Sequence, residues 1–304
     1  MLYRASSGVG TVITYCTNDF RFISKCVEEA KVFSQQVVIV VCDHFFDGTP
    51  ENRMLLEHTY RAHSDCQFIE FAYFRDRLYS KYHFLKPQDP DWAAYWAATS
   101  RYIGFQYLDP DIASVFFLDS DEIAEGGRVL SWLQSEVDIQ YEVMRLGSYY
   151  YALKPTLQAE HLVNLPFFVQ RKRFFPLILF NGLERLGAYL SYNGPKRESV
   201  LGEDGKPLFH HYSWVRTKSE CLLKGRTWSH HKEQDWNRLV EEAFSTDDIR
   251  GIFGTEHTFH TISSPYFDPF EVVIPQKSIE GPFPNVLKIQ DRDLFRKQIQ
   301  NELI

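Results

Sequence analysis

Apolar, β-rich runs alternate with segments of helical spacing through the first 125 residues, and this alternation limits the folds open to the chain. The runs that favour buried strands are 11–16, 37–42, 66–72 and 115–119. The segments that favour helices begin at Phe20, at Pro50 and at Trp92. Strands and helices in this order predict an α/β fold with a mostly parallel central sheet, flanked by helices and joined by right-handed crossovers.

The pattern loosens after residue 125 and predicts a mixed second half. A short helix is expected over 128–134, and one or two strands over 141–153. Further strands are expected at 167–170, 176–180 and 208–214, with a Gly- and Pro-rich loop over 193–207. The last third predicts a helix over 232–244 and an amphipathic helix near 291–303.

Composition and charge exclude several classes of function. The 304 residues carry a formal charge of −7, which argues against binding to nucleic acid. Five scattered cysteines without a C-x-x-C pair suggest neither a disulfide framework nor a structural zinc site. No apolar window approaches the ~18 residues of a membrane span. The sequence therefore predicts a cytoplasmic protein with at most peripheral membrane contact.

Two carboxylates follow the fourth predicted strand, at Asp119 and Asp121. The carboxyl end of parallel strands is where open α/β sheets bind their ligands. Paired carboxylates suit a hard divalent cation such as Mg²⁺ or Mn²⁺. The alternative is that both residues cap the helix that begins near Gly126.

Several motifs resemble those of family 2 glycosyltransferases, nucleotide-sugar enzymes of the GT-A fold. Residues 14–52 resemble the opening of that family, and Ser100 to Gly104 resemble its helix before the metal motif. Val115 to Ile123 are similar to its strand and D-x-D motif, in a D-x-D-E-I form also found in family 17-like members. The resemblance covers roughly residues 10–125 and implies a nucleotide-sugar-binding half over 1–125. An acceptor-binding half over 126–304 would complete one continuous GT-A domain.

A histidine motif in the second half resembles the H-Y-x-W-V motif of bacterial glycosyltransferase-like proteins. It spans His211 to Arg216. The resemblance implies that His211 joins Asp119 and Asp121 around the metal, with His210 as the competing choice.

The resemblance also implies roles for other residues. Donor binding would fall to Thr14, Cys16, Asn18, Asp43, Arg101, Ser120 and Lys224. Asp121 would take part in catalysis, and the general base would be Glu184, Glu203 or Asp204, although none of the three lies in a recognisable motif.

The implied activity is an inverting, metal-dependent transfer of a hexosyl or N-acetylhexosaminyl group from a nucleotide-diphosphate sugar, with UDP-sugars favoured. The acceptor would be a hydroxyl of a glycan, a lipid-linked sugar or a protein. Two alternatives stay open. One is a non-catalytic module that binds glycans or a protein. The other, ranked lower, is a sugar-phosphate nucleotidyltransferase, because the first strand lacks the Gly-rich loop that would hold a triphosphate.

Overall fold

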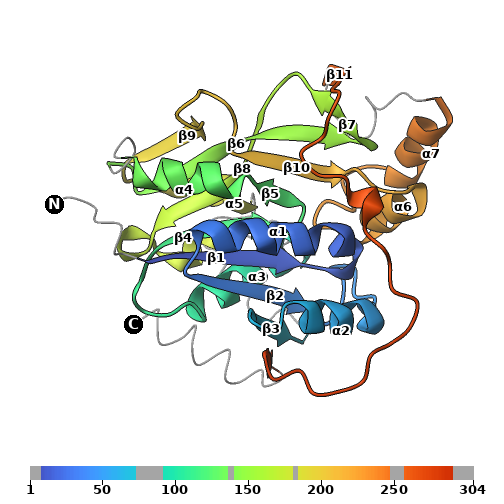
Figure 1. Ribbon diagram of the computed structural model, residues 1–304, viewed down its shortest axis with the longest axis horizontal. Coiled ribbons are helices and arrows are strands. Elements are labelled where there is room, and N and C mark those ends of the chain that lie inside the picture. Colours follow the sequence, from blue (N-terminus) through green and yellow to red (C-terminus); the bar gives the residue numbers. More distant parts are fainter. Residues whose placement is uncertain (1–7, 73–91, 136–139, 181–183, 247–256, 290–304) are drawn as a thin grey trace.

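A computed structural model describes residues 8–72, 92–135, 140–180, 184–246 and 257–289. Within these ranges, twelve strands form one sheet, whose main order is β11-β7-β6-β8-β4-β1-β2-β3-β12, and helices cover its faces (Figure 1). The predicted irregular segment at 73–90 and the predicted helix near 291–303 lie outside the described residues. None of the helices in the described ranges is long and apolar enough to cross a membrane.

The first half of the chain builds the parallel part of the sheet, as its alternating pattern predicted. Its strands are β1 (Gly8–Tyr15), β2 (Gln36–Cys42), β3 (Gln67–Phe71) and β4 (Ile112–Asp119). Helices α1 (Phe20–Phe33), α2 (Arg53–Ala62) and α3 (Trp92–Gln106) connect them. The pairs β1–β2, β1–β4 and β2–β3 are all parallel, so these strands end at the same edge of the sheet.

The second half is mixed, also as predicted. It contains β5 (Glu122–Ala124), α4 (Gly126–Gln134), β6 (Val143–Ala152), β7 (Lys154–Ala159), β8 (Val163–Gln170), α5 (Glu184–Ser191), β9 (Lys196–Val200), β10 (Phe209–Trp214), α6 (Lys218–Thr227), α7 (Trp236–Thr246), β11 (Phe259–Thr261) and β12 (Val286–Ile289). Strand β8 runs antiparallel to β4, and β12 returns to pair in parallel with β3. The predicted fold class, an α/β fold with a parallel first half and a mixed second half, is confirmed.

Side chains on successive residues of β4 enter two different cores, one on each face of the sheet. Phe116 and Leu118 pack in the cluster that includes α1, whereas Val115 and Phe117 pack in the cluster that includes α3. This alternation is the pleat of a strand that is covered on both sides, and it explains why the run is continuously apolar. The carboxylates begin where the run ends, at the edge of the sheet.

One predicted strand is wrong, and several elements were not expected. Residues Pro176–Phe180 form a 3-10 helix, η5, that packs against α3. A short apolar run has the same periodicity whether it is a buried strand or a buried turn, so the sequence alone could not separate them. Helix α5 and the short strands β5, β7, β9, β11 and β12 also appear only in the structure, with β9 inside the predicted loop 193–207.

Candidate functional site

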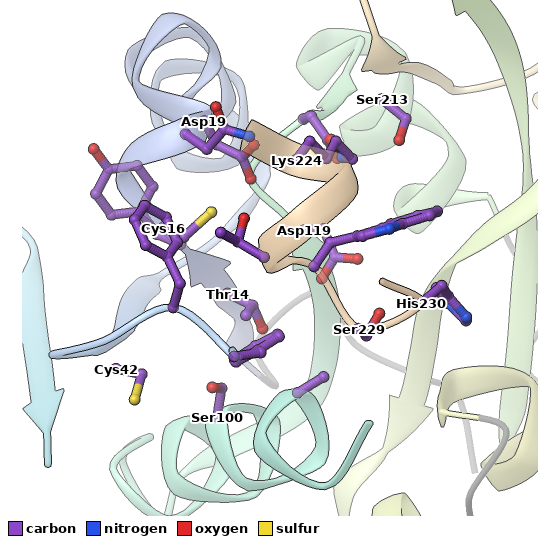
Figure 2. Close-up of a pocket in the computed structure, with 18 of the residues that line it drawn as sticks. Thr14, Cys16, Asp19, Cys42, Ser100, Asp119, Ser213, Lys224, Ser229 and His230 are labelled. Carbon is purple, nitrogen blue, oxygen red and sulfur yellow. The ribbon is translucent and has the colours of Figure 1, made fainter. Parts of the chain in front are cut away.

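A pocket opens at the carboxyl ends of β1, β2 and β4, and its cavity volume is about 190 Å³ (Figure 2). Helices α3, α5 and α6 and strand β10 supply the remaining walls. Its polar lining residues include Thr14, Asn18, Asp19, His44, Glu51, Ser100, Arg101, Asp119, Asp121, Glu184, Arg185, His211, Ser213, Lys224 and His230. The pocket therefore lies where α/β sheets of this kind bind ligands.

Asp119, at the end of β4, is held by two guanidinium groups. Its Oδ1 accepts a hydrogen bond from Nη2 of Arg101 at 2.8 Å, and its Oδ2 accepts one from Nη2 of Arg185 at 2.8 Å. Burial raises the pKa of Asp119, but the nearby Arg101 and Arg185 outweigh burial and leave the pKa below its ordinary value. Asp119 is therefore a carboxylate with both oxygens engaged.

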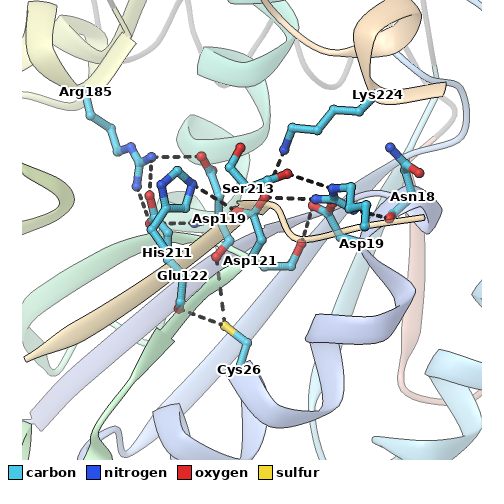
Figure 3. A network of polar contacts seen from close by, with 12 residues as sticks. Asn18, Asp19, Cys26, Asp119, Asp121, Glu122, Arg185, His211, Ser213 and Lys224 are labelled. Carbon is cyan, nitrogen blue, oxygen red and sulfur yellow. Dashed lines mark hydrogen bonds and ion pairs between the residues drawn. The ribbon is translucent and has the colours of Figure 1, made fainter. Parts of the chain in front are cut away.

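Asp121 is held by two different cations (Figure 3). Its Oδ2 accepts hydrogen bonds from Nζ of Lys224 at 2.9 Å and from Nη2 of Arg216 at 3.0 Å. Burial raises the pKa of Asp121, but Lys224, His211 and Arg216 together hold the pKa well below its ordinary value. The two aspartates thus form separate ion-pair clusters on either side of Ser120.

Ser120 and Glu122 lie beneath the pocket rather than in its wall. Ser120 is fully buried and its Oγ donates to Oδ2 of Asp19 at 2.7 Å. Glu122 is fully buried as well and accepts two hydrogen bonds from Arg185, at 2.6 and 2.7 Å. Burial raises the pKa of Glu122, and Arg185 opposes that rise. The predicted donor contact of Ser120 therefore has no direct route to a ligand in this arrangement.

His211 faces the pocket and His210 faces away. Nε2 of His211 lies 3.5 Å from Oδ1 of Asp121. His210 is bonded to the hydroxyl of Tyr151 at 2.8 Å and to Oε1 of Glu125 at 3.1 Å, on the other face of β10. Successive residues of a strand point to opposite faces, so only one of the two histidines can belong to the site.

The predicted metal ligands do not form a metal shell in this arrangement. A divalent ion needs several oxygen or nitrogen atoms directed at one point. Three of the four carboxylate oxygens of Asp119 and Asp121 already accept hydrogen bonds from cations. That leaves Oδ1 of Asp121 and Nε2 of His211 as the atoms not engaged by a guanidinium or ammonium group. Within the described ranges, no group of three or more His, Cys, Asp or Glu side chains is arranged to hold a metal ion.

Polar atoms without a partner converge on the pocket. Each is buried and belongs to a residue that lines it: Oγ1 of Thr14, Oδ1 of Asn18, Nε and Nη1 of Arg101, Oε1 of Glu184, Nδ1 of His211 and Nε1 of Trp228. Buried polar groups are normally hydrogen-bonded, and exceptions call for an explanation. Their common location indicates a polar ligand as the missing partner.

The end of β2 contributes residues other than the predicted Asp43. Cys42, His44 and Glu51 line the pocket, whereas Oδ1 of Asp43 is bonded to Nδ1 of His44 at 2.7 Å and Asp43 is absent from the pocket wall. Glu51 accepts a hydrogen bond from the backbone N–H of Thr17 at 2.9 Å. Burial raises the pKa of Glu51 to about 8, against the opposing hydrogen bonds from Thr17. The raised pKa favours the protonated form of Glu51 near neutral pH.

The predicted bases lie in different places: Glu203 and Asp204 are exposed and outside the pocket lining, whereas Glu184 belongs to it. Glu184 lines the pocket at the start of α5, where its φ of +52° lies in the left-handed region. Its Oε2 is 3.6 Å from Nη2 of Arg101, and its Oε1 is 3.9 Å from Nε2 of His230. Asp204 lies on an exposed turn, where it pairs with Arg128 at 2.5 Å, and it is not among the lining residues. Backbone strain of this kind clusters at functional sites, which favours Glu184.

Sequence reasoning missed two arginines that organise the site. Arg185 bridges Asp119 and Glu122, and Arg216 bridges Asp19 and Asp121. Arg216 closes the H-Y-S-W-V-R segment, and Arg185 directly follows Glu184, so each had a neighbour of interest in the sequence. No local pattern indicates which arginines are buried, because that depends on long-range packing.

Comparison with known proteins found similar structures but no similar sequence. No protein-family model and no curated protein matches the chain. A 4-diphosphocytidyl-2C-methyl-D-erythritol synthase from Anaerococcus prevotii is 9% identical with a TM-score of 0.41, over 71% of this chain and 96% of that one. A glucosyl-3-phosphoglycerate synthase from Mycobacterium tuberculosis, in complex with Mn²⁺, UDP and phosphoglyceric acid, is 12% identical with a TM-score of 0.38, over 87% and 90%. A mannosyltransferase from Pyrobaculum calidifontis, in complex with GDP-mannose and Mn²⁺, is 9% identical with a TM-score of 0.40, over 79% and 64%. Each similarity is one of structure alone, at sequence identities of 9–12%.

Proposed function

We propose that the protein transfers a sugar from a nucleotide-diphosphate donor to an acceptor hydroxyl, with inversion at the sugar carbon. The observation that carries the proposal is a pocket in which buried cations and a carboxylate face the same space. Arg101 on α3 and Lys224 on α6 line the pocket from different helices, and Oε2 of Glu184 lies 3.6 Å from Arg101. Sugar transfer needs this pair of features, because negative charge develops on the leaving diphosphate while the acceptor loses a proton.

Glu184 is the proposed general base. Its Oε1 has no hydrogen-bond partner and would take the proton of the acceptor hydroxyl. The acceptor oxygen then forms a bond to the anomeric carbon, and the bond from that carbon to the diphosphate oxygen breaks. The electron pair leaves with the diphosphate, beside Arg101 and Lys224. A single displacement of this kind inverts the configuration of the sugar carbon.

The nucleoside would occupy the side of the pocket lined by Cys16, Cys42 and Glu51. A protonated Glu51 can donate a hydrogen bond, which an ionised carboxylate cannot. The apolar rings of Phe45 and Phe46 line the same side and offer surfaces on which a base could stack. These features support a nucleotide in preference to a free sugar as the ligand.

The first test measures nucleotide binding. UDP, GDP and CDP, and sugars carried by them, would be added with and without Mn²⁺ while the melting temperature is recorded. A ligand that binds only the folded protein raises its stability. Failure of every nucleotide to bind under both conditions would refute the proposal. Release of pyrophosphate from a nucleoside triphosphate and a sugar phosphate would favour nucleotidyl transfer instead.

The second test separates the base from the binding site. Glu184→Gln should lower the rate of nucleoside-diphosphate release from the bound donor by about 10²- to 10⁴-fold, the usual contribution of a general base. Nucleotide affinity should change little, since the substitution keeps the shape of the side chain. Asp204→Asn is the matched control, because that carboxylate lies outside the pocket. Equal rates in the two variants would show that Glu184 is not the base.

A further inference from the structure

We infer that the pocket binds the diphosphate of its donor through two fixed cations, Arg101 and Lys224, without a divalent ion. The inference rests on the proposed function, because the diphosphate is the leaving group of that reaction. It departs from the expectation that Asp119 and Asp121 hold a metal.

The acidic motif is already neutralised by the protein. Four carboxylates, the buried Asp19, Asp121 and Glu122 and the partly exposed Asp119, make direct contacts with four cations, Arg101, Arg185, Arg216 and Lys224. A divalent ion that binds any carboxylate oxygen of Asp119 or Asp121 other than Oδ1 of Asp121 would have to displace at least one of these cations and then lie beside the others. Like charges repel strongly where water is excluded, so the arrangement disfavours a metal at this point.

The same cations have hydrogen-bond donors to spare. Arg101 is only 2% exposed, yet its Nε and Nη1 have no partner, while its Nη2 is bonded to Asp119. The bond from Lys224 to Asp121 uses one of the three donors of the ammonium group. Both residues line the pocket. Unpaired N–H groups on a buried guanidinium are what a diphosphate oxygen would satisfy.

The aspartates then have a positioning role. Asp119 fixes the guanidinium of Arg101 and Asp121 fixes the ammonium of Lys224, each through a hydrogen bond of 2.8–2.9 Å. Preorganised cations of this kind stabilise developing negative charge without reorganising during the reaction. The acidic pair at the end of β4 holds the cations that contact the ligand, and does not contact the ligand through a metal.

The experiment measures the affinity for UDP, GDP and CDP by calorimetry, with the protein kept in excess EDTA and, separately, in Mn²⁺. We expect equal affinity in the two conditions. Lys224→Met should weaken binding in EDTA by about 10- to 100-fold, the value of one charge-assisted hydrogen bond. Arg226→Met is the matched control, because Arg226 is an exposed cation on the same helix, α6, outside the pocket wall. It should leave the affinity unchanged.

A second variant guards against misfolding. Arg101→Lys keeps the charge near Asp119 but removes the Nε donor and the fork of the guanidinium, and it should also weaken binding in EDTA. The melting temperature of each variant, measured without ligand, shows whether it is folded.

Three outcomes would overturn the inference. Nucleotide binding only in the presence of Mn²⁺ would overturn the inference but would not contradict the proposed function. Unchanged affinity in folded Lys224→Met and Arg101→Lys would also do so. The absence of nucleotide binding in every condition would refute the proposed function together with the inference.

Discussion

Replacement of Arg216 by methionine should lower the free energy of unfolding by about 3–5 kcal/mol at neutral pH, the usual cost of removing one partner of a buried ion pair. Arg216 is 1% exposed, and its guanidinium donates to the carbonyl of Asn18, to Asp19 at 2.5 Å and to Asp121 at 3.0 Å. Methionine keeps an unbranched apolar stem beside Phe22. The two carboxylates, however, would lose the charge that joins them.

The decrease in unfolding free energy caused by Arg216→Met should be smaller in acid, because it depends on the ionised form of Asp121. Burial raises the pKa of this carboxylate, but Lys224, His211 and Arg216 hold it well below its ordinary value. A group with a lowered pKa in the folded state stabilises the fold above its unfolded pKa of about 3.9. That contribution is lost as pH falls through the folded pKa. Because Arg216→Met raises the pKa of Asp121, the variant has less of this contribution to lose.

Urea unfolding, followed by tryptophan fluorescence, would measure both proteins from pH 7 to about pH 3.5, below the ordinary pKa of aspartate. The difference in stability between the two proteins should narrow towards the acid end. Arg238→Met on α7 is the control, since its ion pair with Glu242 is exposed and worth about 0.3–0.5 kcal/mol. A loss below about 1 kcal/mol for Arg216→Met, or a loss that is the same at every pH, would refute the reasoning.

Two further predictions concern the scaffold. Gly104→Ala should lower the free energy of unfolding by about 1–3 kcal/mol through overpacking, because its Cβ would lie 2.3 Å from Cγ1 of Val12. In Gly127→Ala, on α4, the added Cβ meets nothing within 4 Å, and the free energy of unfolding should rise by about 0.5–1 kcal/mol. Equal effects of the two substitutions in urea unfolding would contradict this contrast. Thr217→Ala removes the capping box shared with Glu220 and should cost about 1 kcal/mol in the same assay, whereas Thr217→Ser should not.

The positions of the first four strands along the chain and the location of the acidic pair were predictable, because both are local properties of the sequence. Period-2 and period-3.6 patterns identify strands and helices, and the handedness of crossovers limits how they can be joined. A continuously apolar run such as Val115 to Leu118 must be covered on both faces, so the residues after it have to emerge at an edge of the sheet. The sequence by itself therefore determined that Asp119 and Asp121 lie at the carboxyl end of a central strand.

The chemistry around those carboxylates was decided by the tertiary structure. Arg216 is separated from Asp121 by 95 residues and Arg185 from Asp119 by 66, and nothing in the local sequence pairs them. The choice between His210 and His211 also needed the tertiary structure. Strand alternation predicts that the two side chains point to opposite faces, but only the pairing of β10 with β5 and β6 decides which of them faces the pocket. A D-x-D pattern is compatible with a metal or with paired cations. Which of these applies depends on the charges that the fold brings to the carboxylates, because a carboxylate that stays ionised when buried is paired with a cation or coordinates a metal.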